Sequence, residues 1–238
     1  MSSSLSGLAR LERDVLDDSV ALASLLRQVL IMGGRASSEP LRTWARRELK
    51  GYTDAMNELP DYRKISVQLK ADVIAGPKQF TGQEIGPQDL PESVRNDVKE
   101  EIGMTWGISE IQATAAGSKD GKHIRLGMPG MAYVARLMTK DQQELQHNPF
   151  LTVTSVYWSV STAALEGVLD QVRTQLTEFV AELRATMPPG DEEPTSEQVR
   201  RAVSSIQITV GDNSPVTVAA PVAYAERDAI AIGTADMS

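Results

Sequence analysis

Basic side chains gather in one predicted helix and at its exit, and they have the chemistry to bind an anionic partner. Arg42, Arg46, Arg47 and Lys50 occupy the helix, and Lys64 follows the next predicted turn. Guanidinium and ammonium groups bind phosphates and carboxylates, so the set predicts either a site for an anionic molecule such as nucleic acid or a solvated helix face. The second interpretation depends on five nearby acids that can pair with these cations inside the domain: Glu39, Glu48, Asp54, Glu58 and Asp61.

The other residue patterns do not form a recognisable catalytic or metal site. His123 and His147 lie far apart, and neither has a carboxylate or a second histidine at helical ligand spacing. Adjacent acids at 17–18, 100–101 and 192–193 point about 100° apart on a helix and do not face one another. The chain has no cysteine, no GxSxG elbow and no phosphate-binding loop. We therefore expect no catalytic residues, no metal and no cofactor, and a site of carboxylates that converge only in the fold is the alternative.

Composition narrows the class of protein further. The 238 residues, 41% of them hydrophobic, suffice for a substantial core. The net charge of −8 argues against nucleic-acid binding over the whole surface, so only a local patch such as the basic helix could bind it. No apolar run approaches the ~20 residues that span a bilayer, and the first residues lack the pattern of a secretory signal. We expect a cytoplasmic protein with no membrane partner.

Helical periodicity dominates the first fifty residues. Apolar residues recur every three or four positions in three successive segments, of which the first covers 5–17. Asp18 or Ser19 is expected to cap the second helix, and Ser37 or Ser38 the third. The short connections between these segments predict an antiparallel helical bundle.

Strand patterns appear only after this bundle. Residues 65–75 alternate between apolar and polar, and residues 152–160 are rich in β-branched and aromatic side chains, so both are predicted strands. Ser161 is expected to cap the longest helix, 162–187. The fold class is therefore α+β, with an N-terminal helical bundle, a small sheet, a long amphipathic helix and a C-terminal β-rich tail. Between the two strands we expect a Gly- and Pro-rich loop at 76–93, a helix from Glu92, a helical turn at 108–113, a strand at 123–126 and a helix from Pro129.

The chain changes character after the long helix, so we predict one domain over 1–187. Residues 188–198 include GDEEPTSE, which is too polar to bury itself and is typical of an acidic linker. Within 199–238, two β-rich runs flank the turn-forming residues 211–214. A lone hairpin is marginally stable in water, so these runs are expected to join a sheet of their own domain or of another subunit. We expect the 199–238 segment to contribute to a homo-oligomer.

The segment WARRELKGYTDAMNELPDYR at 44–63 joins the third helix to the first strand through aromatic anchors. Trp44 and Tyr52 share the apolar helix face, Gly51 lies where a helix usually ends, and Pro60 favours an extended residue before it. We expect these residues to be structural. The residues that carry the pattern are Trp44, Glu48, Leu49, Gly51, Tyr52, Leu59, Pro60, Tyr62 and Arg63.

This segment resembles a signature of the AbiTii family of abortive-infection proteins. The likeness spans residues 8–187: ELKGY and LPDYR are followed by GISEIQA, then by VYWSVS and a helix that contains DQVR. The resemblance implies a phage-resistance protein in which this domain is often an N-terminal module attached to diverse C-terminal parts. No established catalytic residue set comes with the family.

The function that the resemblance implies is a non-catalytic, regulatory or sensor component of phage defence. Such a component would act through self-assembly and through contact with a phage or host protein. The alternatives are a metal-dependent nuclease, a nucleotide-acting enzyme, and a nucleic-acid-binding module that uses the basic helix 42–50.

Overall fold

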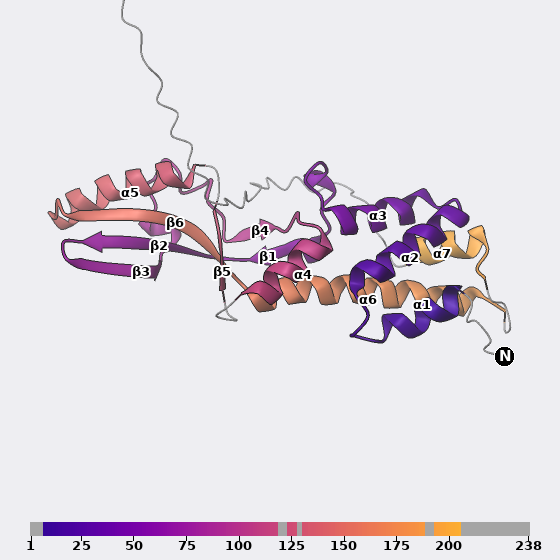
Figure 1. Ribbon diagram of the computed structural model, residues 1–238. Coiled ribbons are helices and arrows are strands. Elements are labelled where there is room, and N and C mark those ends of the chain that lie inside the picture. Colours follow the sequence, from indigo (N-terminus) through magenta and orange to yellow (C-terminus); the bar gives the residue numbers. More distant parts are fainter. Residues whose placement is uncertain (1–6, 119–122, 128–129, 189–192, 206–238) are drawn as a thin grey trace, which may run out of the picture.

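The long helix α6 (Thr162–Thr186) connects the two ends of an elongated molecule (Figure 1). The computed structural model describes residues 7–118, 123–127, 130–188 and 193–205. Helices gather along α6 at one end, and an antiparallel sheet with a covering helix forms the other end. The architecture is α+β, as the sequence predicts.

Apolar stripes from the helices meet in one core at the helical end. Leu25, Leu26 and Trp44 belong to the same buried cluster as Leu176 and Phe179 of α6. Their spacing places them on the inner face of each helix, where burial of apolar surface stabilises the bundle. The three predicted N-terminal helices are confirmed as α1 (Gly7–Val15), α2 (Leu22–Arg35) and α3 (Glu39–Lys50).

The predicted cap of α2 is wrong, whereas Ser38 occupies the N-cap position of α3 as predicted. Helix α2 begins after Ala21, so neither Asp18 nor Ser19 caps it. Ser19 donates its amide and its hydroxyl to the Asp17 carboxylate instead, at 2.9 and 2.6 Å. Ser38 precedes α3, but its side chain makes no capping hydrogen bond. These two helix starts are therefore positioned by packing of the apolar stripes rather than by a side-chain cap.

A further helix, α7 (Ser196–Ser205), corrects the expectation of a linker to residue 198 followed by β structure from 199. Its start is a capping box: Thr195 N donates to Gln198 Oε1 at 2.7 Å, and Gln198 N donates to Thr195 Oγ1 at 3.3 Å. Val199 and two neighbours, at helical spacing, are buried in the core of the helical end. The acidic composition of the preceding residues is typical of a linker, so the sequence pattern favours a linker over this short apolar stripe. The β-rich runs lie outside the described residues, and the division into domains stays a prediction.

In the described residues, the main sheet consists of four antiparallel strands, in the spatial order β3 (Lys78–Glu84), β2 (Gln68–Ala75), β6 (Leu151–Ser161) and β5 (His123–Leu126). Helix α5 (Met131–Gln146) packs on one face, with Val134 and Met138 in the same apolar cluster as Val153 of β6. Strand β6 continues directly into α6. Ser161 caps α6 as predicted, because its Oγ accepts a hydrogen bond from Ala164 N at 3.1 Å.

The strand predicted at 65–75 is confirmed as β1 (Lys64–Ser66) and β2, which are separated at Val67. Two other expectations for the segment before α4 (Ile108–Gly117) are wrong. The loop predicted at 76–93 contains β3, whose side chains are polar or solvent-exposed and show no alternation. The helix predicted from Glu92 is absent; Ile102 lies in β4 (Glu101–Gly103), which pairs with β1. This long-range pairing overrides the local helical spacing of the valines at 94 and 98.

The remaining predicted elements are confirmed. The helical turn at 108–113 is the start of α4, and the strand at 123–126 and the helix after Pro129 are β5 and α5. The described part of the chain also contains three short 3₁₀ turns: η1 (Met56–Glu58), η2 (Asp61–Arg63) and η3 (Pro87–Asp89). Among the described helices, none is both long and apolar enough to cross a membrane.

Candidate functional site

The predicted aromatic joint lies where the end of α3, the turn η2 and residues 103–107 meet. Gly51 ends α3 with a φ of 94°, and Tyr52 N donates to Thr105 O at 2.8 Å. A Cβ on Gly51 would lie 2.4 Å from Thr105 O, and a Cβ on Gly107 would lie 2.6 Å from Leu49 O. Glycine at both positions therefore allows the two backbone segments to touch.

A fully buried ion pair occupies the centre of this joint. Arg63 Nη2 lies 2.5 Å from Glu48 Oε2, and both side chains are 0% exposed. The guanidinium also donates through Nη1 to Met104 O at 2.9 Å and to Trp106 O at 2.6 Å. The cation thus has one carboxylate and two carbonyls as partners, which compensates for its loss of water.

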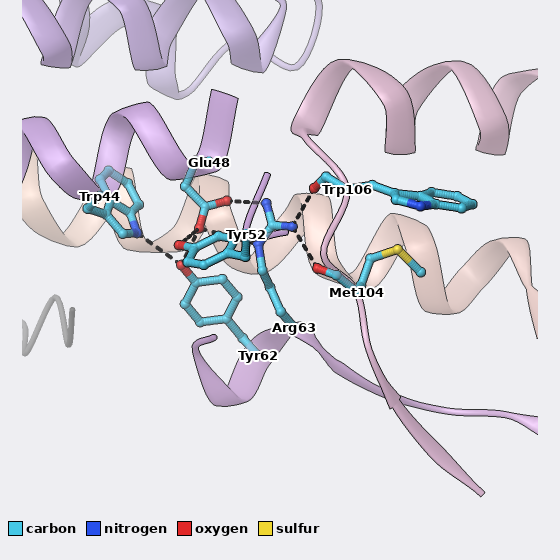
Figure 2. A network of polar contacts seen from close by, with 7 residues as sticks. All are labelled: Trp44, Glu48, Tyr52, Tyr62, Arg63, Met104 and Trp106. Atoms are coloured by element: carbon cyan, nitrogen blue, oxygen red, sulfur yellow. Dashed lines mark hydrogen bonds and ion pairs between the residues drawn. The ribbon is translucent and has the colours of Figure 1, made fainter. Parts of the chain in front are cut away.

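Three aromatic side chains complete the network (Figure 2). The hydroxyls of Tyr52 and Tyr62 both donate to Glu48 Oε1, at 2.6 and 2.8 Å. Trp44 Nε1 donates to the Tyr62 hydroxyl at 2.9 Å. The guanidinium carbon of Arg63 also lies 4.8 Å from the centroid of the Tyr52 ring. Every ring in this chain of contacts therefore has a polar partner inside the protein.

Electrostatics keeps the two phenols and the guanidinium of this network protonated. Burial raises the pKa of Tyr52 and of Tyr62, and the negative charge of Glu48 raises both further. The phenols therefore stay protonated and donate to Glu48. Burial disfavours the charged form of Arg63, but the Glu48 carboxylate outweighs this effect and the pKa of Arg63 is raised. The joint is closed and internally satisfied, and its chemistry holds two backbone segments together.

The structure also places the other residues of the signature. Leu59 and Pro60 are buried and Leu49 is half-buried against the helical core. Leu59 and Pro60 precede η2, which carries Arg63 to the joint. Trp44 and Tyr52 are each 2% exposed, so both aromatic anchors are packed inside the domain.

The basic residues 42–64 are mostly paired within the domain. Lys50 is exposed and makes no ion pair in the described part of the chain, whereas the other four cations each lie beside an acid. Glu48 is not among these partners, because it belongs to Arg63. Binding of an anionic partner by this set stays a prediction. The ion pairs are Arg42–Glu39 (2.8 Å), Arg46–Glu39 (3.9 Å), Arg47–Glu58 and Lys64–Asp61 (2.5 Å).

Comparison with known proteins gives one match. The AbiTii family profile matches residues 8–208, which is most of the chain and includes α7. The chain belongs to the AbiTii family. AbiTii is an abortive-infection domain, so the family implies a role in phage defence. No curated protein and no solved structure matches.

This AbiTii domain has a second polar cluster, which the sequence reasoning missed. The Asp72 carboxylate on β2 accepts hydrogen bonds from Gly82 N at 2.7 Å, Arg125 Nη1 at 2.7 Å, Ser155 Oγ at 3.1 Å and Tyr157 OH at 3.2 Å. Burial alone would raise the pKa of Asp72, but the Gly82 amide and the Arg125 guanidinium outweigh it and lower that pKa. The donors come from the three other strands of the sheet, so the cluster ties all four together.

The sequence carried only a weak signal for this cluster. Asp72 occupies a polar position in the alternating pattern of 65–75, and that pattern predicts a place on the solvent-exposed face of the strand. The pairing of β2 with β3 and β6 shifts register near Asp72, and only the assembled sheet brings Arg125 and Tyr157 to it. Among the described residues, no group of three or more His, Cys, Asp or Glu side chains is placed to hold a metal ion.

Proposed function

We propose that this AbiTii domain serves phage defence as an interaction component, which senses, scaffolds or regulates and does not itself catalyse a reaction. The observation that supports this proposal is the closed Glu48–Arg63 joint. Its acid, cation and phenols are fully engaged with one another and with backbone carbonyls, so they have no access to a substrate. The signature segment of the family thus contributes architecture, and recognition is left to the surface.

Self-assembly and contact with a phage or host protein are the two forms of recognition in this proposal. The proposal is supported by large apolar side chains that are exposed on this folded domain. Where such side chains lie together, they mark surfaces that bind other proteins. The β-rich runs at 206–238 are proposed to add to the homo-oligomer, because a lone hairpin needs a sheet to join.

The function is tested by phage challenge. Cells with the gene are expected to give a lower plating efficiency of phage than cells with an empty vector. Equal plating across a broad phage panel would count against a defence role.

The catalytic alternative is tested with the same cells and with purified protein. Asp72→Asn removes the carboxylate that lies beside a cation and a phenol in the sheet, and it is expected to leave protection intact. The purified full-length chain is expected to leave DNA, RNA and nucleotides unchanged in the presence of magnesium or manganese. Turnover of any of these, lost in a folded Asp72→Asn variant together with protection, would replace our proposal by the enzymatic one.

A further inference from the structure

Two large apolar side chains protrude at the outer end of the sheet. Leu145 is 74% exposed and Phe150 is 73% exposed, on either side of the turn from α5 to β6. We call this pair the apolar tip. Single exposed hydrophobic residues are common on protein surfaces, but two large ones on one turn offer a partner two apolar side chains at the same end of the molecule.

The turn that carries the apolar tip is fixed by hydrogen bonds. Gln143 Nε2 donates to Leu151 O at 2.7 Å and to Pro149 O at 3.2 Å, and Phe150 N donates to Asn148 Oδ1 at 3.0 Å. Phe150 O accepts from Gly76 N in the neighbouring β2–β3 turn at 3.2 Å. A side chain on such a turn loses little backbone freedom when it is buried by a partner, which favours binding.

A hollow of about 530 Å³ lies at the opposite end of the molecule, between the start of α1, the end of α2 and residues 193–196. Its lining includes the apolar residues Leu8, Ile31 and Met32 and the cations Arg10 and Arg35. We call it the end hollow. Its volume is in the range of protein pockets that take a ligand larger than one side chain, so it has room for a phenyl ring and a leucine side chain together.

The tip and the hollow both contain apolar side chains, and the charges around them are opposite in sign. Residues 141–150 carry the carboxylates of Asp141 and Glu144 and no Lys or Arg. In the hollow, Arg35 is 71% exposed and its contact with Glu193 is a long 3.4 Å, and Arg10 makes no ion pair in the described part of the chain. A guanidinium also attracts the face of an aromatic ring such as Phe150.

We propose that the apolar tip of one molecule inserts into the end hollow of a second copy. This inference rests on the self-assembly in the proposed function and names its contact surfaces. The tip of a molecule cannot reach its own hollow, because the turn from α5 to β6 and the start of α1 lie at opposite ends of the molecule (Figure 1). The contact is therefore head-to-tail, and repetition of such a contact adds further copies in a row unless the rotation closes a ring.

Sedimentation velocity on the purified full-length chain over a range of concentrations tests this contact. The wild-type chain is expected to associate more as its concentration rises. Phe150→Ser and Arg35→Glu are each expected to raise the apparent Kd at least about tenfold, since each removes a central group of the contact. Leu16→Ser is the matched control, because Leu16 is also 73% exposed but belongs to neither surface, and it is expected to behave as wild type.

Mixing the two variants separates head-to-tail contact from any other mode. Phe150→Ser keeps an intact hollow, and Arg35→Glu keeps an intact tip. At a concentration at which neither variant associates alone, an equimolar mixture is expected to form dimers and nothing longer. All three substituted side chains are exposed, so circular dichroism should show unchanged folding.

Three results would overturn the inference: a wild-type chain that stays monomeric at every concentration, a Phe150→Ser variant that associates like wild type, or a mixture that gives no dimers. The phage assay separates this inference from the proposed function. If Phe150→Ser abolishes association but cells keep full protection, the contact stands and self-assembly is removed from the function. If association is unchanged while protection is lost, the contact is wrong and the defence role stands.

Discussion

Glu48→Gln is the sharpest test of the buried joint. The substitution keeps the shape of the side chain and removes its charge, so Arg63 remains fully buried without a carboxylate. The amide would also place either a second donor or a weaker acceptor 2.5 Å from Arg63 Nη2. Removing one partner of a buried ion pair costs about 3–5 kcal/mol of folding free energy. For a chain of this size that corresponds to a fall in Tm of about 6–20 °C.

Thermal unfolding followed by circular dichroism measures this loss. Glu39→Gln is the matched control, because Glu39 also pairs with an arginine, Arg42 at 2.8 Å, but the two side chains are 62% and 40% exposed. An exposed pair contributes about 0–1 kcal/mol, so the control should fall by only a few degrees. Equal Tm values for the two variants would refute the conclusion that the joint is a closed, desolvated network.

A double replacement separates charge from packing. With Glu48→Met and Arg63→Met together, no unpaired charge remains in the joint. The carbonyls of Met104 and Trp106 lose their donor, and the hydroxyls of Tyr52 and Tyr62 lose their acceptor. Each unsatisfied buried group costs about 1–3 kcal/mol, so the double variant should be less stable than wild type although it contains no unpaired charge. The difference between its Tm and that of Glu48→Gln, measured by circular dichroism, separates the loss of hydrogen bonds from the burial of an unpaired cation.

Three further changes test other parts of the structure. Gly51→Ala should destabilise the chain by more than about 1 kcal/mol in urea unfolding, because the new Cβ would lie 2.4 Å from Thr105 O and the residue has a positive φ. Gly34→Ala is the control: its Cβ would have nothing within 4 Å and the residue lies in a helix, so this variant should be as stable as wild type or more stable. The pKa of Asp72 is lowered in the folded protein, so its contribution to stability is present above its unfolded pKa of about 4 and is lost as the pH falls through the folded value. Unfolding curves of Asp72→Asn should therefore depend less on pH below about 4 than those of wild type. Val199→Ala should lower the free energy of unfolding by roughly 1–3 kcal/mol, since Val199 is fully buried. Glu197 is exposed, so Glu197→Ala should change that free energy by less than about 0.5 kcal/mol. Equal effects of the two substitutions would contradict the packing of α7 on the core.

The sequence predicts the elements whose apolar pattern is strong and local. The stripes of α2, α3 and α6 and the β-branched run of β6 need no long-range information, and all four are confirmed. Strand β3 could not be found in this way, because a solvent-exposed edge strand has no apolar face to reveal it. Helix α7 had a readable signal in its capping box, but its acidic surroundings suggested a linker.

The polar contacts of the joint could likewise be predicted only in part from the sequence. Glu48 lies on the apolar face of α3, and a carboxylate at such a position already indicates a buried partner. The sequence nevertheless contains several basic residues near Glu48, and nothing in their spacing distinguishes Arg63 from the cations of α3 as its partner. Nothing local reveals that Met104 and Trp106, more than forty residues later, supply the carbonyls that complete the site.

The position of the joint gives it a mechanical role in the proposed head-to-tail contact. Glu48 belongs to the helical end, while Arg63 immediately precedes β1 and holds the segment that follows β4. This network therefore connects the two ends of the molecule in addition to α6, and each added connection restricts bending further. If the ends carry complementary surfaces, the angle between them decides whether successive copies line up. A loosened joint in Glu48→Gln should then weaken association even though the tip and the hollow are unchanged.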